Sequence, residues 1–376
     1  MHTAYSNPDP AKTDQLDGLR FFAFAAVFFF HFQPSPEYSS VLMFQKQGWV
    51  GVEVFFALSA FLLFRLFEQE QRRNGRISFS RFYARRLLRI YPLMILFPIA
   101  MLLAYGAQGA EAYGWLLSLA SFVSNYLYWF PEKARSITNT GHLWTLSYEF
   151  QIYLVLPMLF LTYRAIGTRA FMLALLCVLP VCFLGRASFA LSGMSVQWVY
   201  VTPMLRPEST VAGLLVALGL GRNLPIPVVS IAFLASCAGL VLLPDMHTQL
   251  GSVFVYLTAA IFTGSLLHLA LYAKAFAQLL RWRPLAYLGR ISFGLYVFHL
   301  WAFVEGMSLL RMTPIPENYA TRCLAGMSLC IVAATVSYYL LERPILRLKP
   351  RAQSAKITVG SPPISASIAR AVGSVE

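Results

Sequence analysis

The sequence predicts an all-α fold: a polytopic transmembrane helical bundle of about ten spanning helices, with one further re-entrant or interfacial segment. Of the 376 residues, 58% are hydrophobic and only 12% are charged, which is about half the charged fraction of a soluble domain. Uncharged stretches such as 226–243 and 251–272 approach the ~20 residues that a helix needs to cross the hydrocarbon core. Because backbone groups in lipid must be paired within their own segment, these stretches are expected to be helices.

The apolar segments follow one another along most of the chain. We expect residues 1–15 to be a cytoplasmic N-terminal segment, 16–348 to be the transmembrane domain and 349–376, rich in Ser, Ala, Gly and Pro, to be a disordered tail. The predicted spans, in order, are 19–33, 48–67, 91–106, 143–163, 170–185, 208–221, 226–243, 251–272, 291–310 and 322–342. Segment 115–130 is short and interrupted by serines and Asn125, so it is assigned as re-entrant or interfacial.

The distribution of basic residues predicts the topology. Lys and Arg concentrate on the cytoplasmic side of membrane proteins. With a cytoplasmic N-terminus and ten spans, 23 of the 30 lysines and arginines lie inside, whereas an eleventh span at 115–130 would leave only 16 inside. The sequence therefore predicts a membrane protein with ten spanning helices and both termini in the cytoplasm. This topology accounts for the net charge of +14, so no nucleic-acid partner is expected.

The first predicted span carries three ionisable residues, Asp17, Arg20 and His31. Ionisable groups inside a membrane are costly and are candidates for function. Eleven residues place Arg20 and His31 on nearly the same helix face and about 16 Å apart along the axis. Arg20 could be a headgroup anchor paired with Asp17 or part of a site. His31 could be an interfacial histidine or a general base acting on a hydroxyl.

Residues 141–157 carry a second polar face. His142, Thr145, Glu149 and Tyr153 recur at helical spacing, and Asn139 or Thr140 is expected to cap the helix. A buried Glu149 needs a partner, and His31 is predicted to lie at a similar depth. The alternative is that Glu149 holds the backbone or an arginine of another helix.

Four arginines form a third group, at positions 81, 85, 86 and 89. The alternatives are an interfacial helix on anionic lipid headgroups and a clamp for the phosphates of coenzyme A, for which Arg forks are suited.

Residues 288–301 contain a fourth group. Ser292, Tyr296 and His299 share one helix face, and a packed, hydrogen-bonded His299 is favoured over a catalytic one. Gly289 and Gly294 would allow a neighbouring helix to approach closely. No pattern of His or Cys ligands predicts a metal site, and no dinucleotide or phosphate-loop motif is present.

Six segments together resemble the acyltransferase-3 family of bacterial membrane O-acyltransferases. They occur in the family's order between residue 16 and about 350, and each is weak alone. The segments are LDGLR with His31, GVEVFFALSAFLLF (51–64), FYARRLLRIYP (82–92), HLWTLSYEFQIYLVLP (142–157), LGRISFGLYVFH (288–299) and YYLLERP (338–344).

The resemblance implies a ten-helix bundle in the bacterial cytoplasmic (inner) membrane, a cytoplasmic acyl-CoA donor and a carbohydrate or other hydroxyl acceptor. By position, it implies that His31 is the catalytic base, Arg20 its partner in the helix, and Glu149 the acid of the fourth segment. Two departures are visible: Phe150 stands where a second acid is common, and Ala60 where a glycine follows Ser59.

The predicted function is transfer of an acyl group, acetyl above all, from acyl-CoA to a hydroxyl of a cell-envelope or exported carbohydrate. Catalysis is assigned to His31 and Glu149, donor binding or its support to Arg20, Asp17, Arg86 and Arg89, and an acceptor-site or structural role to His142, Tyr153, Tyr296 and His299. The expected partners are acyl-CoA as co-substrate, a carbohydrate or lipid-linked glycan and the lipid bilayer, with no bound cofactor or metal. The alternative is a proton-coupled secondary transporter, against which no inverted repeat is visible.

Overall fold

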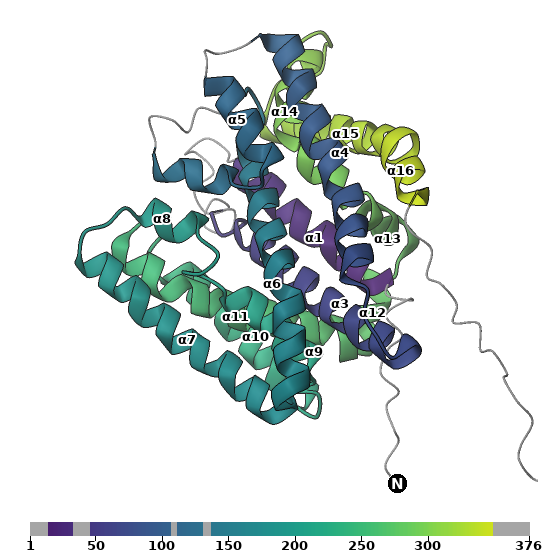
Figure 1. Ribbon diagram of the computed structural model, residues 1–376. Coiled ribbons are helices and arrows are strands. Elements are labelled where there is room, and N and C mark those ends of the chain that lie inside the picture. The colour runs from purple at the N-terminus through teal and green to yellow at the C-terminus, as the bar shows by residue number, and fades with distance from the viewer. Residues whose placement is uncertain (1–13, 33–45, 107–110, 131–136, 349–376) are drawn as a thin grey trace, which may run out of the picture.

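The computed structural model describes residues 14–32, 46–106, 111–130 and 137–348, and all regular structure in them is helical (Figure 1). The first half of the chain forms α1 (Asp14–His31), α3 (Val50–Asn74), α4 (Phe79–Tyr105), α5 (Glu111–Ala120), η2 (Ser124–Trp129), η3 (Gly141–Leu143), α6 (Trp144–Ile166) and α7 (Thr168–Leu191). The second half forms α8 (Val196–Val201), α9 (Glu208–Ala217), α10 (Ile226–Leu242), α11 (Gln249–Tyr272), α12 (Lys274–Leu280), α13 (Arg283–Arg290), α14 (Ser292–Leu310), α15 (Tyr319–Ser337), the π-helical η4 (Tyr338–Glu342) and α16 (Arg343–Arg347). The predicted all-α fold is confirmed.

Seven helical segments in the described ranges are long and apolar enough to cross a membrane. They are Val50–Asn74, Phe79–Tyr105, Gly141–Ile166, Thr168–Leu191, Gln249–Tyr272, Ser292–Leu310 and Tyr319–Arg347. The other three predicted spans coincide with α1, which carries three charged residues, with the 10-residue α9 and with the 17-residue α10. Length and composition thus support a polytopic bundle and seven of its ten predicted spans.

Segment 115–130 contains no single spanning helix. It is divided between α5 and η2, and Phe122 between them has a left-handed backbone with φ of 57°. The side chain of Asn125 in η2 donates a hydrogen bond to the carbonyl of Val201, which ties η2 to the end of α8. The predicted N-terminal segment, apart from residues 14 and 15, and the predicted tail lie outside the described residues.

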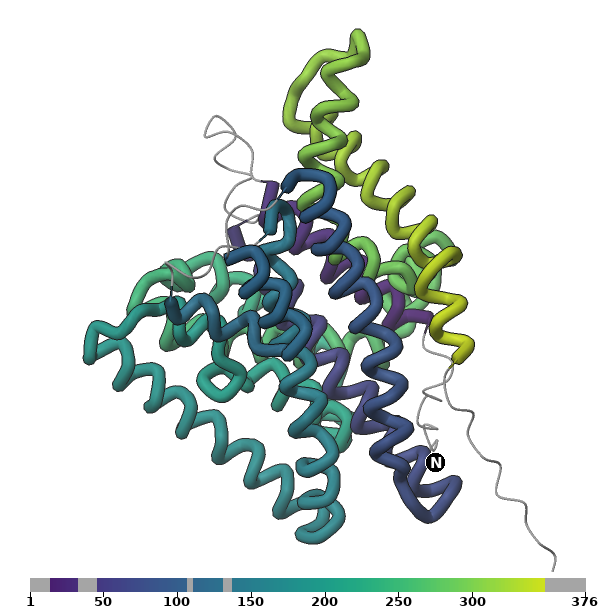
Figure 2. The backbone as a smooth tube through the Cα atoms, turned by 45° about the horizontal axis from the view of Figure 1, so that its top comes forward, coloured from purple at the N-terminus to yellow at the C-terminus, as the bar shows by residue number. Residues whose placement is uncertain are grey.

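Helix α1 lies at the centre of the bundle and packs against α3, α12, α13 and α14 (Figures 1 and 2). Glycines allow these close approaches. A Cβ on Gly51 would lie 2.2 Å from the carbonyl oxygen of Ala23, and one on Gly289 would lie 1.7 Å from that of Asp17. The prediction that Gly289 allows a neighbouring helix to approach is therefore confirmed. The two contacts fix the position of α1 against α3 and α13.

Two buried ion pairs lie at this side of the bundle, one between α3 and the turn that precedes α9, the other between α7 and α9. Arg206 pairs with Glu53, and Arg186 pairs with Glu208 at 2.5 Å, with each of the four side chains at most 1% exposed. The guanidinium of Arg206 also lies 4.7 Å from the ring centroid of Tyr200. Buried charges remain stable only when they are paired in this way, so the two pairs fix the relative positions of these helices.

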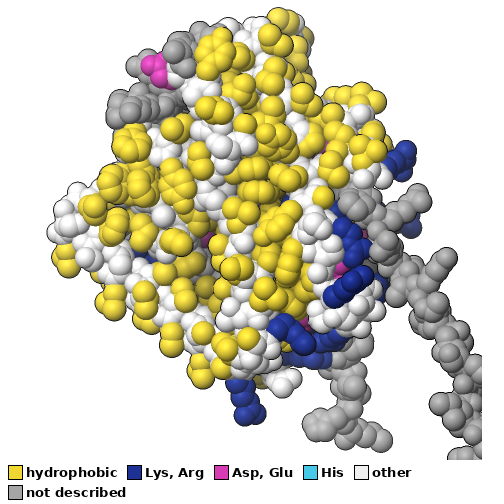
Figure 3. Space-filling view, viewed as in Figure 1, with side chains coloured by type: hydrophobic (Ala, Val, Ile, Leu, Met, Phe, Trp, Pro, Cys, Tyr) yellow, Lys and Arg dark blue, Asp and Glu magenta, His cyan; other side chains and the backbone are white. Residues whose placement is uncertain are grey.

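The surface outside this core is largely apolar. Figure 3 shows hydrophobic side chains over most of one face, with Lys and Arg gathered at its lower right. Large aliphatic side chains are exposed on several helices, including Leu103 at 82% and Leu242 at 81%. Soluble proteins rarely expose such extensive apolar area, and this surface is suited to contact with lipid.

Candidate functional site

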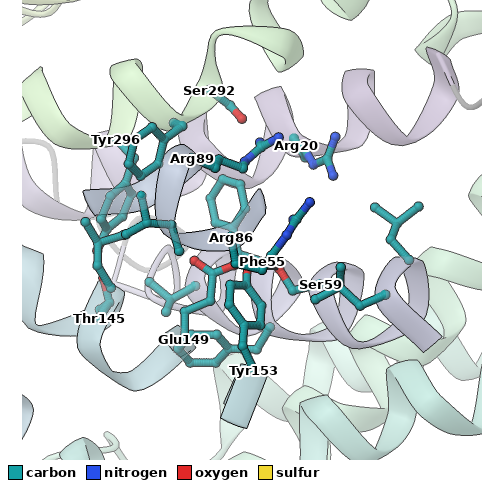
Figure 4. A pocket seen from close by; sticks show the side chains of 17 residues that line it. Arg20, Phe55, Ser59, Arg86, Arg89, Thr145, Glu149, Tyr153, Ser292 and Tyr296 are labelled. Carbon is teal, nitrogen blue, oxygen red and sulfur yellow. Dashed lines mark hydrogen bonds between the residues drawn. The ribbon is translucent and has the colours of Figure 1, made fainter. Parts of the chain in front are cut away.

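A cavity of about 80 Å³ lies between α1, α3, α4, α6 and α14. Three arginines, Arg20, Arg86 and Arg89, line it together with Glu149 and Tyr153. Figure 4 shows the arginine side chains directed towards the space that faces Glu149 and Tyr153. The structure therefore brings together residues of the first three groups singled out in the sequence.

The arginines of α4 divide between two environments. Arg86 and Arg89 line the cavity, and the guanidinium of Arg86 lies 6.0 Å from the ring centroid of Tyr153. Arg81 and Arg85 instead face Glu70 near the end of α3, at 3.6 and 3.9 Å. The predicted group of four is thus two pairs, and only one pair can meet a ligand in the cavity.

Arg20 combines both roles considered from the sequence. Its Nη1 pairs with Asp17 Oδ1 at 2.5 Å, and its side chain lines the cavity beside Arg86 and Arg89. The carboxylate of Asp17 holds the guanidinium in place, and three guanidinium groups surround one small space. Such a space favours a ligand with several negative charges.

Glu149 has partners other than the one predicted. Its Oε1 accepts hydrogen bonds from Ser59 Oγ, at 2.6 Å, and from the hydroxyl of Tyr153. The predicted pairing of Glu149 with His31 is wrong. Position along a helix fixes depth but not which neighbour the side chain faces, and this face of α6 is turned towards α3.

Three histidines form a cluster beyond the cavity. His299 Nε2 lies 3.2 Å from His31 Nδ1, and the ring centroids of His299 and His142 are 4.6 Å apart. His299 and His142 are buried, whereas His31 is exposed. The packed, hydrogen-bonded environment favoured for His299 is confirmed, and its partner is the histidine predicted to be the base.

Two hydroxyl groups separate the cavity from the histidine cluster. Tyr296 and Thr145 both line the cavity, and their oxygens are 2.6 Å apart. Tyr296 also donates to the carbonyl oxygen of His142 at 3.2 Å, and its ring centroid is 5.5 Å from that of His299. The cavity ends at this pair, and His31 is not among its lining residues.

The predicted helix cap at the start of this segment is wrong. Helix α6 begins at Trp144 after the 3-10 turn η3, and no side chain caps either element. The hydroxyl of Thr140 instead accepts from the indole of Trp115 and donates to the carbonyl of Ile137. The 3-10 turn places His142 in the histidine cluster. An α-helix that continued back to Thr140 would place the His142 side chain elsewhere.

Sequence reasoning missed two polar residues of this region. Ser59 lines the cavity and bonds Glu149. Glu342 ends the π-helical turn, is 9% exposed and accepts a hydrogen bond from Ser337 Oγ at 3.4 Å. The signal for Glu342 was present, since it is an acid at the end of an apolar segment, and π-helical turns are frequent at functional sites.

One family of known proteins matches nearly the whole chain. A family model described as an acyltransferase domain, Acyl_transf_3, matches residues 13–342, which include every residue of the cavity and the histidine cluster. The chain belongs to the acyltransferase-3 family. The predicted resemblance and the predicted class of enzyme, an acyltransferase, are thereby confirmed.

Several relatives of this acyltransferase domain carry individual names. YrhL of Bacillus subtilis (strain 168) is 25% identical over 358 residues, which cover 88% of this chain and 54% of YrhL. The O-acetyltransferase OatA of Staphylococcus aureus (strain NCTC 8325 / PS 47) is 24% identical, over 89% of this chain and 57% of OatA. The acyltransferase MdmB of Streptomyces mycarofaciens is 28% identical, over 92% of this chain and 94% of MdmB.

The chain thus spans little more than half the length of the first two relatives. No solved structure matches it.

Proposed function

We propose that this domain transfers an acyl group, acetyl above all, from acyl-CoA to a hydroxyl of a cell-envelope or exported carbohydrate. One observation carries the proposal: a cavity lined by three arginines ends at two hydroxyls that touch a cluster of three histidines. The names of the relatives support it, since OatA is described as an O-acetyltransferase and the description of YrhL names peptidoglycan as a candidate acceptor.

The arginines fit the donor end of this reaction. Coenzyme A carries several phosphates, and guanidinium groups bind phosphate oxygens in bidentate pairs. Arg20, Arg86 and Arg89 would meet those phosphates from the cytoplasmic side, with Asp17 holding Arg20 in place. Acyl-CoA acts here as a co-substrate, and the proposal needs no resident cofactor.

The histidines fit the acceptor end. In the proposed step, His31 takes the proton of the acceptor hydroxyl while its oxygen attacks the thioester carbonyl. The carbon–sulfur bond then breaks, and the departing thiolate of coenzyme A receives the proton from His31. General-base assistance of this kind contributes about 10²–10⁴-fold in rate.

The remaining residues support this path. Glu149 holds Ser59 and Tyr153 along the cavity wall, and His142 packs against His299. The pantetheine arm must pass the hydrogen bond between Tyr296 and Thr145 to bring its thioester to His31. Opening of that bond on donor binding is therefore part of the proposed cycle.

The test uses the full chain in lipid nanodiscs with acetyl-CoA labelled in the acetyl group. We expect release of free thiol and transfer of label to a peptidoglycan-derived disaccharide, and saturable binding of acetyl-CoA in the absence of acceptor. If the protein neither binds acetyl-CoA nor cleaves it with any supplied glycan, the proposal is wrong. Proton-driven uptake of a solute into proteoliposomes, with the thioester intact, would favour the transporter instead.

A further inference from the structure

The contacts of the two paired histidines determine where their protons lie. His299 Nδ1 is 2.6 Å from the carbonyl oxygen of Tyr296. A carbonyl oxygen only accepts hydrogen bonds, so Nδ1 of His299 carries the proton. In a neutral imidazole the other nitrogen is then an acceptor, and this nitrogen, Nε2, is the one that faces His31.

The same reasoning applies to His31. Its Nδ1 lies 3.0 Å from the carbonyl oxygen of Val27 and 3.2 Å from His299 Nε2. Both neighbours are acceptors, so the Nδ1 of His31 carries a proton and its Nε2 has a free lone pair. The carbonyl of Val27 lies four residues back in α1 and also accepts the backbone N–H of His31. His299 is therefore the acceptor without a competing helical bond.

The exposures of the two rings agree with this assignment. His299 is 0% exposed, and its ring packs against His142 and Phe24 at centroid distances of 4.6 and 6.2 Å. His31 is exposed. The buried ring cannot meet an acceptor substrate, whereas the exposed one can present its Nε2.

We propose that His299 is a positioning residue that holds His31 in the tautomer with Nδ1 protonated and Nε2 free to accept the proton of the acceptor hydroxyl. This inference rests on the proposed function, in which His31 is the base. A neutral histidine side chain in water prefers the opposite tautomer, with the proton on Nε2. In that tautomer Nε2 cannot act as a base. A wrong tautomer can remove most of a histidine's contribution to catalysis.

The experiment compares two substitutions at one position. In His299→Gln, the side-chain amide oxygen can take the place of Nε2 and accept from His31. His299→Phe keeps a planar ring but provides no acceptor. Among folded, monodisperse proteins, we expect His299→Phe to lower single-turnover acetyl transfer about 10²-fold or more and His299→Gln to stay within about tenfold of the unchanged protein. Equal losses in the two variants would overturn the proposal.

A second measurement does not depend on activity. Nitrogen-15 NMR of imidazole-labelled protein distinguishes protonated from unprotonated ring nitrogens, and His31→Ala identifies the His31 signals. We expect Nδ1 protonated and Nε2 unprotonated in the unchanged protein. The reverse assignment there would overturn the inference even if no variant of His299 folds. An active His31→Ala protein would instead reject His31 as the base and leave the tautomer assignment of the unchanged protein standing.

Discussion

His31 is the residue on which the proposed chemistry depends most directly. Its imidazole is exposed and supported by Val27 and His299, so removing it disturbs little packing. We expect His31→Ala to lower acetyl transfer by about 10²–10⁴-fold while leaving thermal stability and acetyl-CoA binding nearly unchanged. Single-turnover kinetics with labelled acetyl-CoA measures the first quantity and equilibrium binding the second. Near-normal transfer would remove His31 from the chemistry.

The arginines of α4 offer a matched pair of substitutions. Arg89 lines the cavity, whereas Arg81 on the same helix faces Glu70. We expect Arg89→Gln to weaken acetyl-CoA binding by about tenfold or more, since a charged hydrogen bond contributes roughly 1.5–3 kcal/mol. Arg81→Gln should leave donor affinity unchanged. Both variants are titrated with acetyl-CoA at equal salt concentration. Weaker binding in Arg89→Gln alone supports a donor clamp. Equal changes in the two variants would favour a lipid-binding surface.

The sequence predicted which polar residues line the cavity or meet in the histidine cluster better than it predicted their contacts. Helix periodicity correctly grouped Tyr296 with His299, because both lie on one helix. It could not show that His31 meets His299 or that Glu149 meets Ser59. Such pairs depend on the rotation of one helix against another, which hydropathy does not encode.

Among the elements, α1 depends on close contact with α3. A Cβ at Gly51 would lie 2.2 Å from the backbone oxygen of Ala23, whereas one at Gly185 in α7 meets nothing within 4 Å. We expect Gly51→Ala to destabilise the protein by about 1–3 kcal/mol and Gly185→Ala to be neutral or stabilising by up to about 1 kcal/mol. Thermal unfolding in the same detergent compares them. A stable Gly51→Ala protein would show that α1 can shift away from α3.

The extent of each element was predictable where apolar runs are long and simple. Helices α10 and α11 coincide with the predicted segments to within about two residues at each end. Segment 208–221 was predicted too long, because α9 ends at Ala217 and a turn with Gly219 at φ of 90° follows. The π-helical turn that ends at Glu342 and the 3-10 turn at His142 could not be predicted from hydropathy, because hydropathy reports which side chains are apolar and not the hydrogen-bond pattern of the backbone.

For the whole molecule, the distribution of arginines predicts which end lies in the cytoplasm. Asn74 at the end of α3 and Met312 after α14 are both exposed and are predicted to lie on opposite sides. In a protein without its five native cysteines, Met312→Cys should react with an impermeant thiol reagent in intact cells. Asn74→Cys should react only after the cells are opened. The opposite pattern would reverse the topology, and equal labelling would mean that the two positions share one side.

The hydrogen bond between Tyr296 and Thr145 also has a consequence for the energy stored across the membrane. With the predicted topology, the arginine-lined cavity lies towards the cytoplasm and the histidine cluster towards the outside, and these two hydroxyls lie between them. A potential of 100 mV drives each proton with about 2.3 kcal/mol. If these two hydroxyls separated while no donor was bound, protons could cross the membrane down that gradient. Proteoliposomes carrying Thr145→Ala and Tyr296→Phe should therefore lose an imposed pH gradient faster than those carrying the unchanged protein, and bound acyl-CoA should slow the leak.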